Sequence, residues 1–448
     1  MNNRLAIGIA VALGVAAAGR PGLTAEPAAA GFAAVRTRAL AIDNDATASA
    51  AKRCGLLAEL AEFPTADAVR LVVRVGFLGP ADPTARSAAR EALVRLNRHA
   101  RPKAHMLAEF HRQLGRPGTL AIELALVMLA AEPAGEKGGF RDWLDRQAAP
   151  AVATAVCGGV CQQAVIAGDT TAIAALRALA GLRCCTSDLA CRRAVIRALV
   201  TIHRPASVGA LVDLLATLRG EARGDVVAYL TAVSGERHGA DADGWRTWYE
   251  ARRADLVLPE PRPAYSVDGT APAAGGADAS VADYYGIPIY ADRVVFVLDT
   301  SSSMEGPPLE AAKRELESAI AGLPETTAFT VLAFNSGVAA WQRQLVPATD
   351  EAKAGACGFI IPLPAAGGTA TCDALEAAFG FDTEAIFLLS DGAPSRGRIT
   401  DPEAIVRFVA GLNGSRCVSV HAISIMGGAA FLERLAELNN GTFREVAD

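Results

Sequence analysis

Five oxygen-bearing side chains in the C-terminal third of the sequence are of types that bind a hard metal ion. Asp299, Ser301 and Ser303 follow one apolar run, Thr369 follows a pair of glycines, and Asp391 follows another apolar run. Two carboxylates and three hydroxyls are all oxygen ligands, which suit Mg²⁺ foremost, with Mn²⁺ or Ca²⁺ as alternatives. The sequence therefore predicts a divalent-cation site, provided that the fold brings the three segments together.

The elements around these residues are expected to do so. Continuous apolar runs predict buried strands, and they alternate with helical patterns. Such alternation implies an α/β fold with a mostly parallel sheet covered by helices on both faces, and ligands bind such sheets at the carboxyl ends of the strands. Predicted strands are 294–298, 329–334, 339–346 (an edge strand), 385–389, 418–425 and 442–446, and predicted helices are 309–323, 372–379, 402–412 and 431–438.

The pattern Asp-x-Ser-x-Ser at 299–303, with the later Thr369 and Asp391, resembles the von Willebrand factor type A (VWA) domain and its metal-ion-dependent adhesion site. The resemblance covers about residues 292–448 and implies a Rossmann-like fold. It implies that Ser301 and Ser303 bind the cation directly and that Thr369 joins in the ligand-bound form. Asp299 and Asp391 would hold metal-bound waters or bind directly, and an acidic residue of a protein partner would complete the coordination.

The neighbouring sequence also fits the resemblance, at 373–375 after the threonine loop and at 441–443 before the last strand. One departure is Ser302, where this family often has glycine, so that the first loop has less backbone freedom. Taken singly, serine and aspartate at strand ends are common helix caps, and Asp391-Gly392 is a common turn. The presence of all five residues, in order and on the expected elements, favours the metal site.

Three functions are compatible with this site. The leading interpretation is a non-enzymatic protein that binds an acidic partner residue through the cation. An enzyme alternative is a metal-assisted hydrolase, but the sequence has no Gly-x-Ser-x-Gly, His-Glu-x-x-His or Walker-type motif, and both carboxylates are committed to the metal shell. The third is an envelope scaffold with an empty metal site that binds through its helical half.

The N-terminal half is predicted to be helical. Alanine-rich composition favours helices, since 51% of the residues are hydrophobic but only 6% are aromatic. Pro64 and Pro205 open similar amphipathic units, and the 141 residues between them (205 − 64) would hold about four helix pairs of roughly 35 residues each. Residues 47–254 therefore resemble HEAT-type helical repeats, with 205–235 the most typical unit and Trp245 and Trp248 capping the array. A non-repeating helical bundle is the alternative.

The remaining segments complete a multidomain layout. Residues 1–25 look like a signal peptide, because Arg4 precedes an apolar run at 5–19 that is shorter than the roughly 20 residues of a membrane span. An uncleaved anchor is the alternative. We expect residues 26–46 to be disordered, 255–290 to be a linker rich in Pro, Ala and Gly, and 291–448 to form the VWA domain. Export would place the protein in the periplasm or envelope, or outside the cell, with no stable membrane span.

The net charge and the cysteine content limit which classes of partner and which cross-links are expected. The net charge of −5, from 43 basic and 48 acidic residues, gives no reason to expect nucleic acid. Nine cysteines include a central group at 157, 161, 184, 185 and 191. This group favours disulfides in an oxidising compartment over zinc, since no C-x-x-C pair is present, and the odd total leaves at least one thiol unpaired. Cys357 and Cys372 bracket the threonine loop, which suggests a further disulfide.

Overall fold

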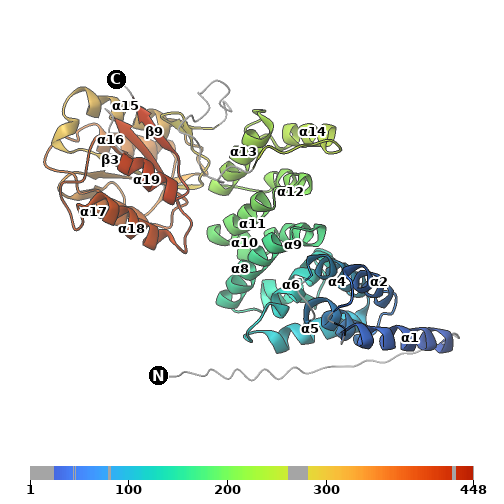
Figure 1. Ribbon diagram of the computed structural model, residues 1–448. Helices are drawn as coiled ribbons and strands as arrows, with labels where there is room; N and C mark the ends of the chain where they lie inside the picture. The colour runs from blue at the N-terminus through green and yellow to red at the C-terminus, as the bar shows by residue number, and fades with distance from the viewer. Residues whose placement is uncertain are drawn as a thin grey trace, which may run out of the picture.

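The computed structural model describes residues 25–43, 45, 47–78, 82–260, 281–425 and 430–446. The predicted signal peptide lies outside these residues, apart from its last position. Two bodies lie next to each other in Figure 1: an elongated array of helices and a sheet flanked by helices.

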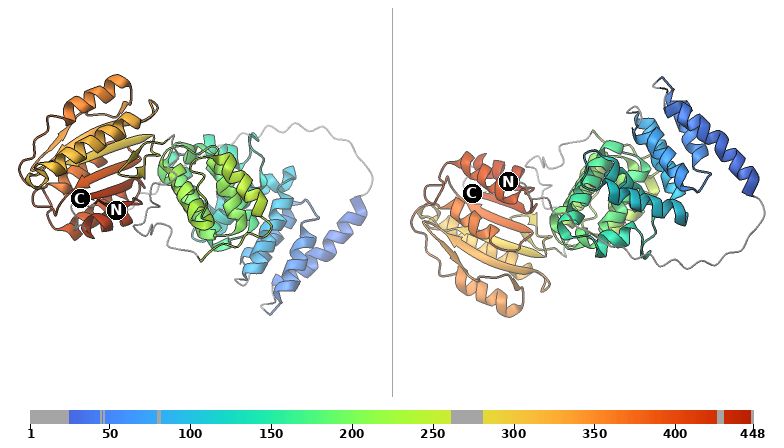
Figure 2. Two further views of the ribbon diagram at one scale, coloured as in Figure 1. Left: turned by 90° about the horizontal axis from the view of Figure 1, so that it is seen from above. Right: turned by 90° about the horizontal axis from the view of Figure 1, so that it is seen from below.

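The N-terminal body is a two-layer helical array. Within each layer most helices contact the next one along, and the layers also contact each other, so that the helices stack as repeats (Figures 1 and 2). Between α5 and α8 the connection runs through α6 of the other layer. One layer consists of α2 (Ala50–Leu60), α4 (Pro83–Leu96), α6 (Leu120–Ala131), α9 (Thr170–Ala180), α12 (Pro205–Leu215) and α14 (Ala242–Arg252). The other consists of α3 (Ala66–Val73), α5 (Ala100–Gln113), α8 (Pro150–Ala167), α11 (Leu189–Ile202) and α13 (Glu221–Ser234). The short helices α7 (Phe140–Arg146) and α10 (Arg183–Thr186) and a π-helical turn (Arg74–Leu78) connect them.

Helix starts follow the signals in the sequence. Thr65, Asp169 and Asp188 each accept a hydrogen bond from a backbone N–H in the first turn of the helix that follows. Proline occupies the first turn of α4, α8 and α12, where its missing N–H costs nothing. At the end of the array, Trp245 is fully buried and Trp248 nearly so, as expected for a capping helix.

The expectation of disorder at 26–46 is wrong for most of that segment, because α1 spans Ala25–Asp43. Val35 and Ala39, one helical turn apart, are buried, and Phe32 contacts Phe63 with ring centroids 5.3 Å apart. Packing of this face against α2 and α3 stabilises a helix whose sequence shows little amphipathic pattern.

Within the described residues, α8 is long and apolar enough to span a membrane, which the sequence analysis did not expect. It contacts α6, α9 and α11 in the array, and Val156, Cys157 and Val160 on it are buried. These contacts are those of a core helix.

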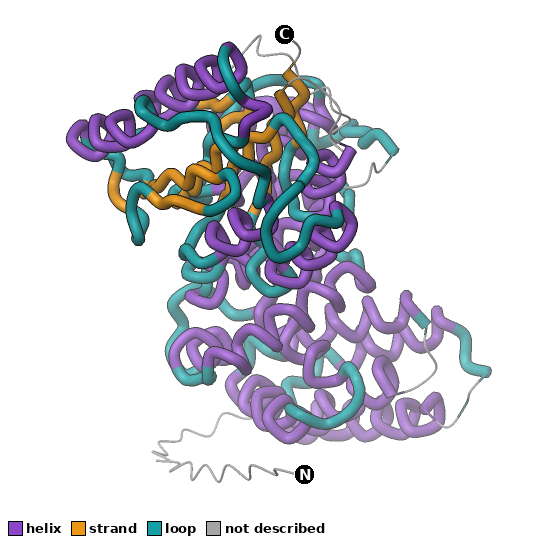
Figure 3. Tube along the Cα trace, turned by 90° about the vertical axis from the view of Figure 1, so that its left-hand side faces the viewer, coloured by secondary structure: helices purple, strands orange, loops and turns teal. Residues whose placement is uncertain are grey.

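The C-terminal body has the predicted, mostly parallel sheet, with strand order β5-β4-β3-β7-β8-β9. Figure 3 shows its strands in orange. The strands β3, β4, β7, β8 and β9 pair in parallel, whereas β5 and β6 run antiparallel to β4. The strands are β3 (Arg293–Asp299), β4 (Ala328–Phe334), β5 (Val338–Ala340), β6 (Val346–Pro347), β7 (Ala385–Ser390), β8 (Ser419–Ile425) and β9 (Phe443–Val446).

Two hydrophobic cores flank this sheet. The first lies under α15 (Pro307–Gly322) and α16 (Asp350–Ile360), and the second lies under α17 (Thr371–Phe379), α18 (Pro402–Asn413) and α19 (Ala430–Leu438). Of these helices only α16 was not predicted from the sequence. The three-layer arrangement is therefore the α/β fold that the alternating pattern indicated.

Part of the predicted linker belongs to this domain. The strands β1 (Asp283–Tyr284) and β2 (Ile287–Pro288) form a hairpin inside the range 255–290. Tyr284 is buried against Phe296 and Phe387, with ring centroids 5.6 and 6.1 Å away. An aromatic anchor on the sheet explains why this short segment is ordered although its surroundings have linker composition.

Candidate functional site

Asp299 forms the buried centre of the predicted site. It is the last residue of β3, and its side chain is fully buried. Its Oδ1 accepts a hydrogen bond from the backbone N–H of Ser301 (2.8 Å), and its Oδ2 accepts one from the hydroxyl of Ser390 (2.5 Å). The carboxylate is thus held rigidly between the loop after β3 and the end of β7.

A chain of hydrogen bonds continues from there to the surface. The hydroxyls of Ser301 and Ser303 lie 3.1 Å apart, and the Ser303 hydroxyl donates to Oδ1 of Asp391 at 3.0 Å. Ser303 is exposed and Asp391 is partly exposed, whereas Ser301 is buried. Four of the five predicted residues are therefore together, with the outer end of the group open to solvent.

Thr369 joins the group through its loop. The backbone N–H of Ser302 donates to the carbonyl of Gly367 (3.1 Å), which brings the threonine loop against the loop after β3. The backbone N–H of Thr369 in turn donates to the hydroxyl of Ser395 (3.0 Å). Gly367 has φ of +74°, a left-handed conformation that favours glycine.

The electrostatics of the group suit a cation. Burial raises the pKa of Asp299, the hydrogen bonds from Ser390 and Ser301 lower it, and the nearby charge of Asp391 raises it again, with a net upward shift. Two carboxylates joined by hydrogen-bonded hydroxyls place negative charge close together. A hard divalent cation would compensate it through oxygen ligands alone, so the residues present fit the predicted metal.

Within the described part of the chain, no group of three or more His, Cys, Asp or Glu side chains is placed to hold a metal ion. The site above has only two such residues and depends on hydroxyls for the rest. The nine cysteines are all free thiols, so neither the expected disulfides of the central group nor a Cys357–Cys372 bridge is formed in this structure.

Sequence reasoning missed Ser390 and Ser395 as supports of the site. Ser390 directly precedes Asp391 at the end of β7, next to β3 in the sheet. Once that strand pairing is known, a serine at this position is expected to reach Asp299. Ser395 lies in the loop after β7, and nothing in the sequence alone indicates that it contacts Thr369.

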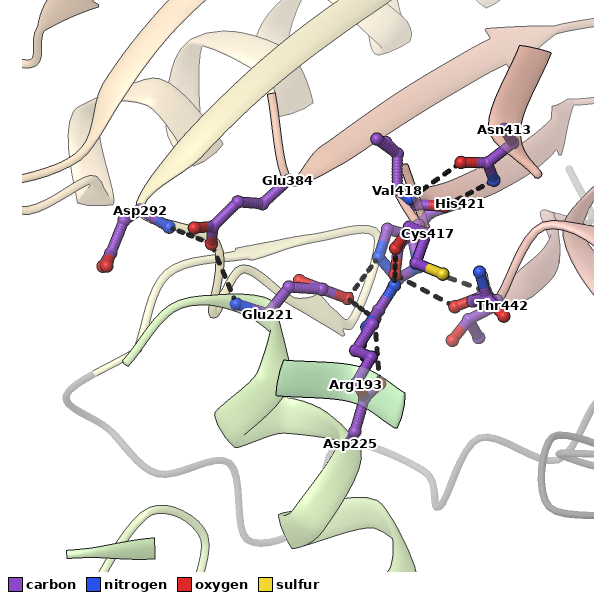
Figure 4. Close-up of polar contacts among 12 residues, drawn as sticks. Arg193, Glu221, Asp225, Asp292, Glu384, Asn413, Cys417, Val418, His421 and Thr442 are labelled. Carbon is purple, nitrogen blue, oxygen red and sulfur yellow. Dashed lines mark hydrogen bonds and ion pairs between the residues drawn. The ribbon is translucent and has the colours of Figure 1, made fainter. Parts of the chain in front are cut away.

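The amino ends of the strands, on the side of the sheet away from the candidate site, contact the helical array (Figure 4). Oε2 of Glu384, just before β7, accepts hydrogen bonds from the backbone N–H of Glu221 (3.1 Å) and of Asp292 (3.2 Å). Glu221 is the first residue of α13, so a carboxylate of the sheet domain caps a helix of the array.

Arg193 of α11 pairs with Asp225 of α13 inside the array and also contacts the sheet domain. Its guanidinium is fully buried, bonds both oxygens of Asp225 (2.7 and 2.9 Å), and donates to the Ser419 hydroxyl (2.7 Å). A further hydrogen bond goes to the carbonyl of Cys417. His421 of β8 is buried, and its Nε2 lies 3.1 Å from Oε1 of Glu221 (Figure 4).

These contacts show that the amino ends of the strands face the array. Glu384, Asp292 and Ser419 lie at the amino ends of β7, β3 and β8, whereas Asp299 and Asp391 lie at the carboxyl ends of β3 and β7. Because the strands are parallel, the array contacts the amino ends of the strands, and the candidate metal site lies at their carboxyl ends, on the opposite side of the sheet domain.

Residues 292–444 match the family described as von Willebrand factor type A domain. The chain is 35% identical over 158 residues to von Willebrand factor A domain-containing protein 3A of Homo sapiens, a match that covers 34% of this chain and 13% of that protein. It is 29% identical over 168 residues to inter-alpha-trypsin inhibitor heavy chain H4 of Bos taurus, covering 34% and 18%. Among solved structures, a von Willebrand factor type A protein from Catenulispora acidiphila is similar over 35% of this chain and 38% of that one, at 24% identity and a TM-score of 0.31.

The matched segment thus spans less than a fifth of either curated relative. It coincides with the body that carries the five site residues and excludes the helical array. The C-terminal part of this chain, residues 292–444, is a von Willebrand factor type A domain, joined to an N-terminal array of helices.

Proposed function

We propose that this protein is a non-enzymatic binding protein whose VWA domain captures a protein partner through a divalent cation, Mg²⁺ foremost. Asp299, Ser301, Ser303, Thr369 and Asp391 would hold the cation, and an acidic side chain of the partner would complete its coordination. Mn²⁺ and Ca²⁺ are the alternatives, since both accept the same oxygen ligands.

One observation carries this proposal: Asp299, Ser301, Ser303 and Asp391 form an unbroken hydrogen-bonded chain from the buried end of β3 to the surface. The inner carboxylate is rigid, and the outer hydroxyl and carboxylate are accessible to a ligand. Both carboxylates of the group would belong to the metal shell, which leaves neither as a general base and favours binding over hydrolysis.

The orientation of the VWA domain on the array would leave the candidate metal site open to a partner protein. The array contacts the amino ends of the strands, so a partner bound at the carboxyl ends would meet the VWA domain on the side away from that contact. The array would then act as a spacer or as a second interaction surface. We further propose that the protein is exported and acts in the periplasm or envelope, or outside the cell.

Titration of the metal-free protein with Mg²⁺ by isothermal calorimetry tests the cation site. We expect saturable binding in the unchanged protein and none in Asp299→Asn. Glu384→Gln is the matched control, because Glu384 is also a buried carboxylate of this sheet but lies at the opposite edge. Equal Mg²⁺ binding by the unchanged protein and by Asp299→Asn, with both folded by circular dichroism, would contradict the proposed site.

The partner is tested by capture from the envelope fraction of the producing cell. A partner that binds in Mg²⁺, is released by EDTA and fails to bind Asp299→Asn would support the proposal. Binding that persists in EDTA would instead favour the alternative in which the helical array binds and the metal site is empty. Turnover of an ester, phosphate or peptide substrate that depends on Asp391 would favour the hydrolase alternative.

A further inference from the structure

A group of five cysteines lies inside the helical array, away from the metal site. Cys157 and Cys161 are one turn apart on α8, Cys184 and Cys185 form the short helix α10, and Cys191 lies near the start of α11. We call Cys157, Cys161, Cys184, Cys185 and Cys191 the thiol cluster. Three of the array's helices therefore converge on one set of sulfur atoms.

The centre of the cluster is the pair Cys157 and Cys185. Both side chains are fully buried, and their Sγ atoms are 3.7 Å apart. The thiol of Cys157 also interacts with those of Cys161, Cys184 and Cys191. Two sulfurs in van der Waals contact need only a small movement to reach the bond length of about 2 Å that a disulfide requires.

Cys184 differs from its neighbours because it is only half-buried and lies at the surface end of the cluster. Hydrogen bonds from the thiols of Cys157 and Cys185 outweigh its burial and lower the pKa of Cys184. Hydrogen bonds with Cys161 and Cys184 raise the pKa of Cys157, and hydrogen bonds with Cys157 and Cys184 raise the pKa of Cys185. The accessible sulfur is therefore the one that favours the reactive thiolate, and the buried sulfurs keep their protons.

The turn that carries the adjacent pair is held in place. The backbone N–H of Arg183 donates to Oδ1 of Asp145 (2.6 Å), and the guanidinium of Arg192 donates to the carbonyls of Cys185 (3.2 Å) and Thr186 (2.6 Å). These bonds fix α10 against α7 and α11, so that Cys185 points into the array while Cys184 stays near solvent. The arrangement therefore places one solvent-accessible thiol, Cys184, next to two buried thiols, Cys157 and Cys185.

We propose that the thiol cluster is a disulfide-forming site, in which Cys184 reacts with an external disulfide and the bond is passed to Cys157 and Cys185. The Cys184 thiolate attacks the oxidant, a small-molecule or protein disulfide, to give a mixed disulfide and one released thiol. Cys157 then attacks the Cys184 sulfur, and its proton passes to the second oxidant thiolate as that thiolate departs. Cys185 finally attacks the Cys157 sulfur, which breaks the Cys184–Cys157 bond, and the proton of Cys185 passes to the departing Cys184 sulfur, so that Cys184 is again a thiol.

The electrons and protons of this sequence balance. Cys157 and Cys185 together lose two hydrogens, and the oxidant disulfide gains them as two thiols. The product bond joins α8 to α10 across 28 residues of chain and is buried, which protects it from reduction. The bond would cross-link the part of the array that directly precedes α11. This is the helix whose Arg193 contacts the VWA domain.

The test uses the full chain equilibrated in buffers of oxidised and reduced glutathione, then quenched in acid and alkylated. In oxidising buffer we expect a chain lighter by two hydrogens before alkylation, two fewer alkylated thiols, and a cross-linked peptide that contains Cys157 and Cys185. Cys184→Ala, a half-buried position that tolerates the change, should form the same bond about tenfold more slowly, because the entry thiolate is lost.

Cys357→Ala is the control for that rate, since Cys357 is a half-buried thiol of the VWA domain far from the cluster in sequence, and it should oxidise like the unchanged chain. Full alkylation of all nine thiols in oxidising buffer would overturn the proposal. A cross-link between other cysteines, or zinc bound stoichiometrically by the purified chain and lost in Cys157→Ala, would overturn it as well. These outcomes are independent of Mg²⁺ binding at the VWA domain.

Discussion

The hydroxyl of Ser390, at the end of β7, donates a hydrogen bond of 2.5 Å to Oδ2 of Asp299, at the end of the neighbouring strand β3. Both side chains are fully buried. The other oxygen of Asp299 is held by the backbone N–H of Ser301, so the carboxylate is fixed at both atoms before any ligand arrives. Ser390 is therefore a positioning residue for the candidate metal site.

Replacing Ser390 with alanine should weaken Mg²⁺ binding without abolishing it. The substitution removes the hydrogen bond that orients Asp299 but leaves all five proposed ligand residues in place. Loss of a supporting partner of this kind lowers metal affinity about tenfold or more. Calorimetric titration of Ser390→Ala with Mg²⁺ measures the effect.

Ser424→Ala is the matched control for this change. Ser424 lies opposite Ser390 in the register of β7 and β8, is also fully buried, and its hydroxyl has no hydrogen-bond partner among the described residues. We expect unchanged Mg²⁺ affinity in this variant. Equal losses in both variants would mean that Ser390 acts through packing of the sheet rather than through Asp299.

Replacing Ser302 with glycine should leave the site intact. The side chain of Ser302 is exposed, and the residue contributes through its backbone N–H, which donates to the carbonyl of Gly367. Glycine retains that N–H, so we expect Mg²⁺ affinity within about threefold of the original, with a slightly lower melting temperature from the added backbone freedom. A larger loss of affinity would show that the serine side chain itself positions the loop.

The sheet, and the meeting of the candidate site residues at the carboxyl ends of its strands, could be predicted from the sequence because both depend on local patterns. Apolar runs mark the strands, and parallel strands bring their carboxyl ends to one edge, which places Asp299 and Asp391 together. The hairpin at β1 and β2 could not be predicted, since its order depends on Tyr284 packing against two aromatic rings of the sheet. The helix α1 likewise depends on tertiary packing rather than on its own sequence pattern.

The interface between the two bodies was also beyond prediction. Arg193 and Ser419 are 226 residues apart, and His421 and Glu221 are 200 apart, with no local signal that links either pair. A buried arginine within a helical stretch indicates an ion pair, but the sequence does not say with which residue. The location of the thiol cluster was partly predictable from cysteine spacing, whereas the contact of Cys157 with Cys185 was not.

Gly441 should not tolerate alanine. A Cβ atom at this position would lie 1.8 Å from the carbonyl oxygen of Val420 and 2.3 Å from its carbon, both backbone atoms of β8 that cannot move aside. We expect Gly441→Ala to lower the free energy of unfolding by about 3 kcal/mol or more, because the last strand would be forced away from its neighbour. Chemical denaturation followed by circular dichroism measures this loss.

The control for Gly441 is Gly411 on α18, where an added Cβ meets nothing within 4 Å. Alanine at this helical position should raise the free energy of unfolding by about 0.5–1 kcal/mol, because it lowers the flexibility of the unfolded chain. If both glycine substitutions proved neutral, the close pairing of the segment before β9 with β8 would be wrong.

Arg193 should hold the VWA domain against the array. Arg193→Leu removes the bonds to Asp225, Ser419 and the Cys417 carbonyl, and it leaves the buried carboxylate of Asp225 without its partner. Removing one member of a buried ion pair costs about 3–5 kcal/mol. We expect the two bodies to separate, measured as a larger radius of gyration by small-angle X-ray scattering and as faster proteolysis between them. Arg434→Leu is the control, because Arg434 pairs with Glu437 on an exposed face of α19 and should contribute less than about 1 kcal/mol.

The double variant Arg193→Met/Asp225→Leu separates charge from packing in the same contact. Burial raises the pKa of Asp225 while the charge of Arg193 lowers it, so the carboxylate depends on the arginine to stay ionised inside the interface. Replacing both residues with apolar side chains removes the unpaired charge that the single variant leaves behind. We therefore expect the double variant to recover much of the compact scattering profile that Arg193→Leu loses. The ion pair itself lies within the array, between α11 and α13. If the double variant were as extended as the single one, loss of the hydrogen bonds from Arg193 to Cys417 and Ser419, rather than the unpaired charge of Asp225, would be what separates the two bodies.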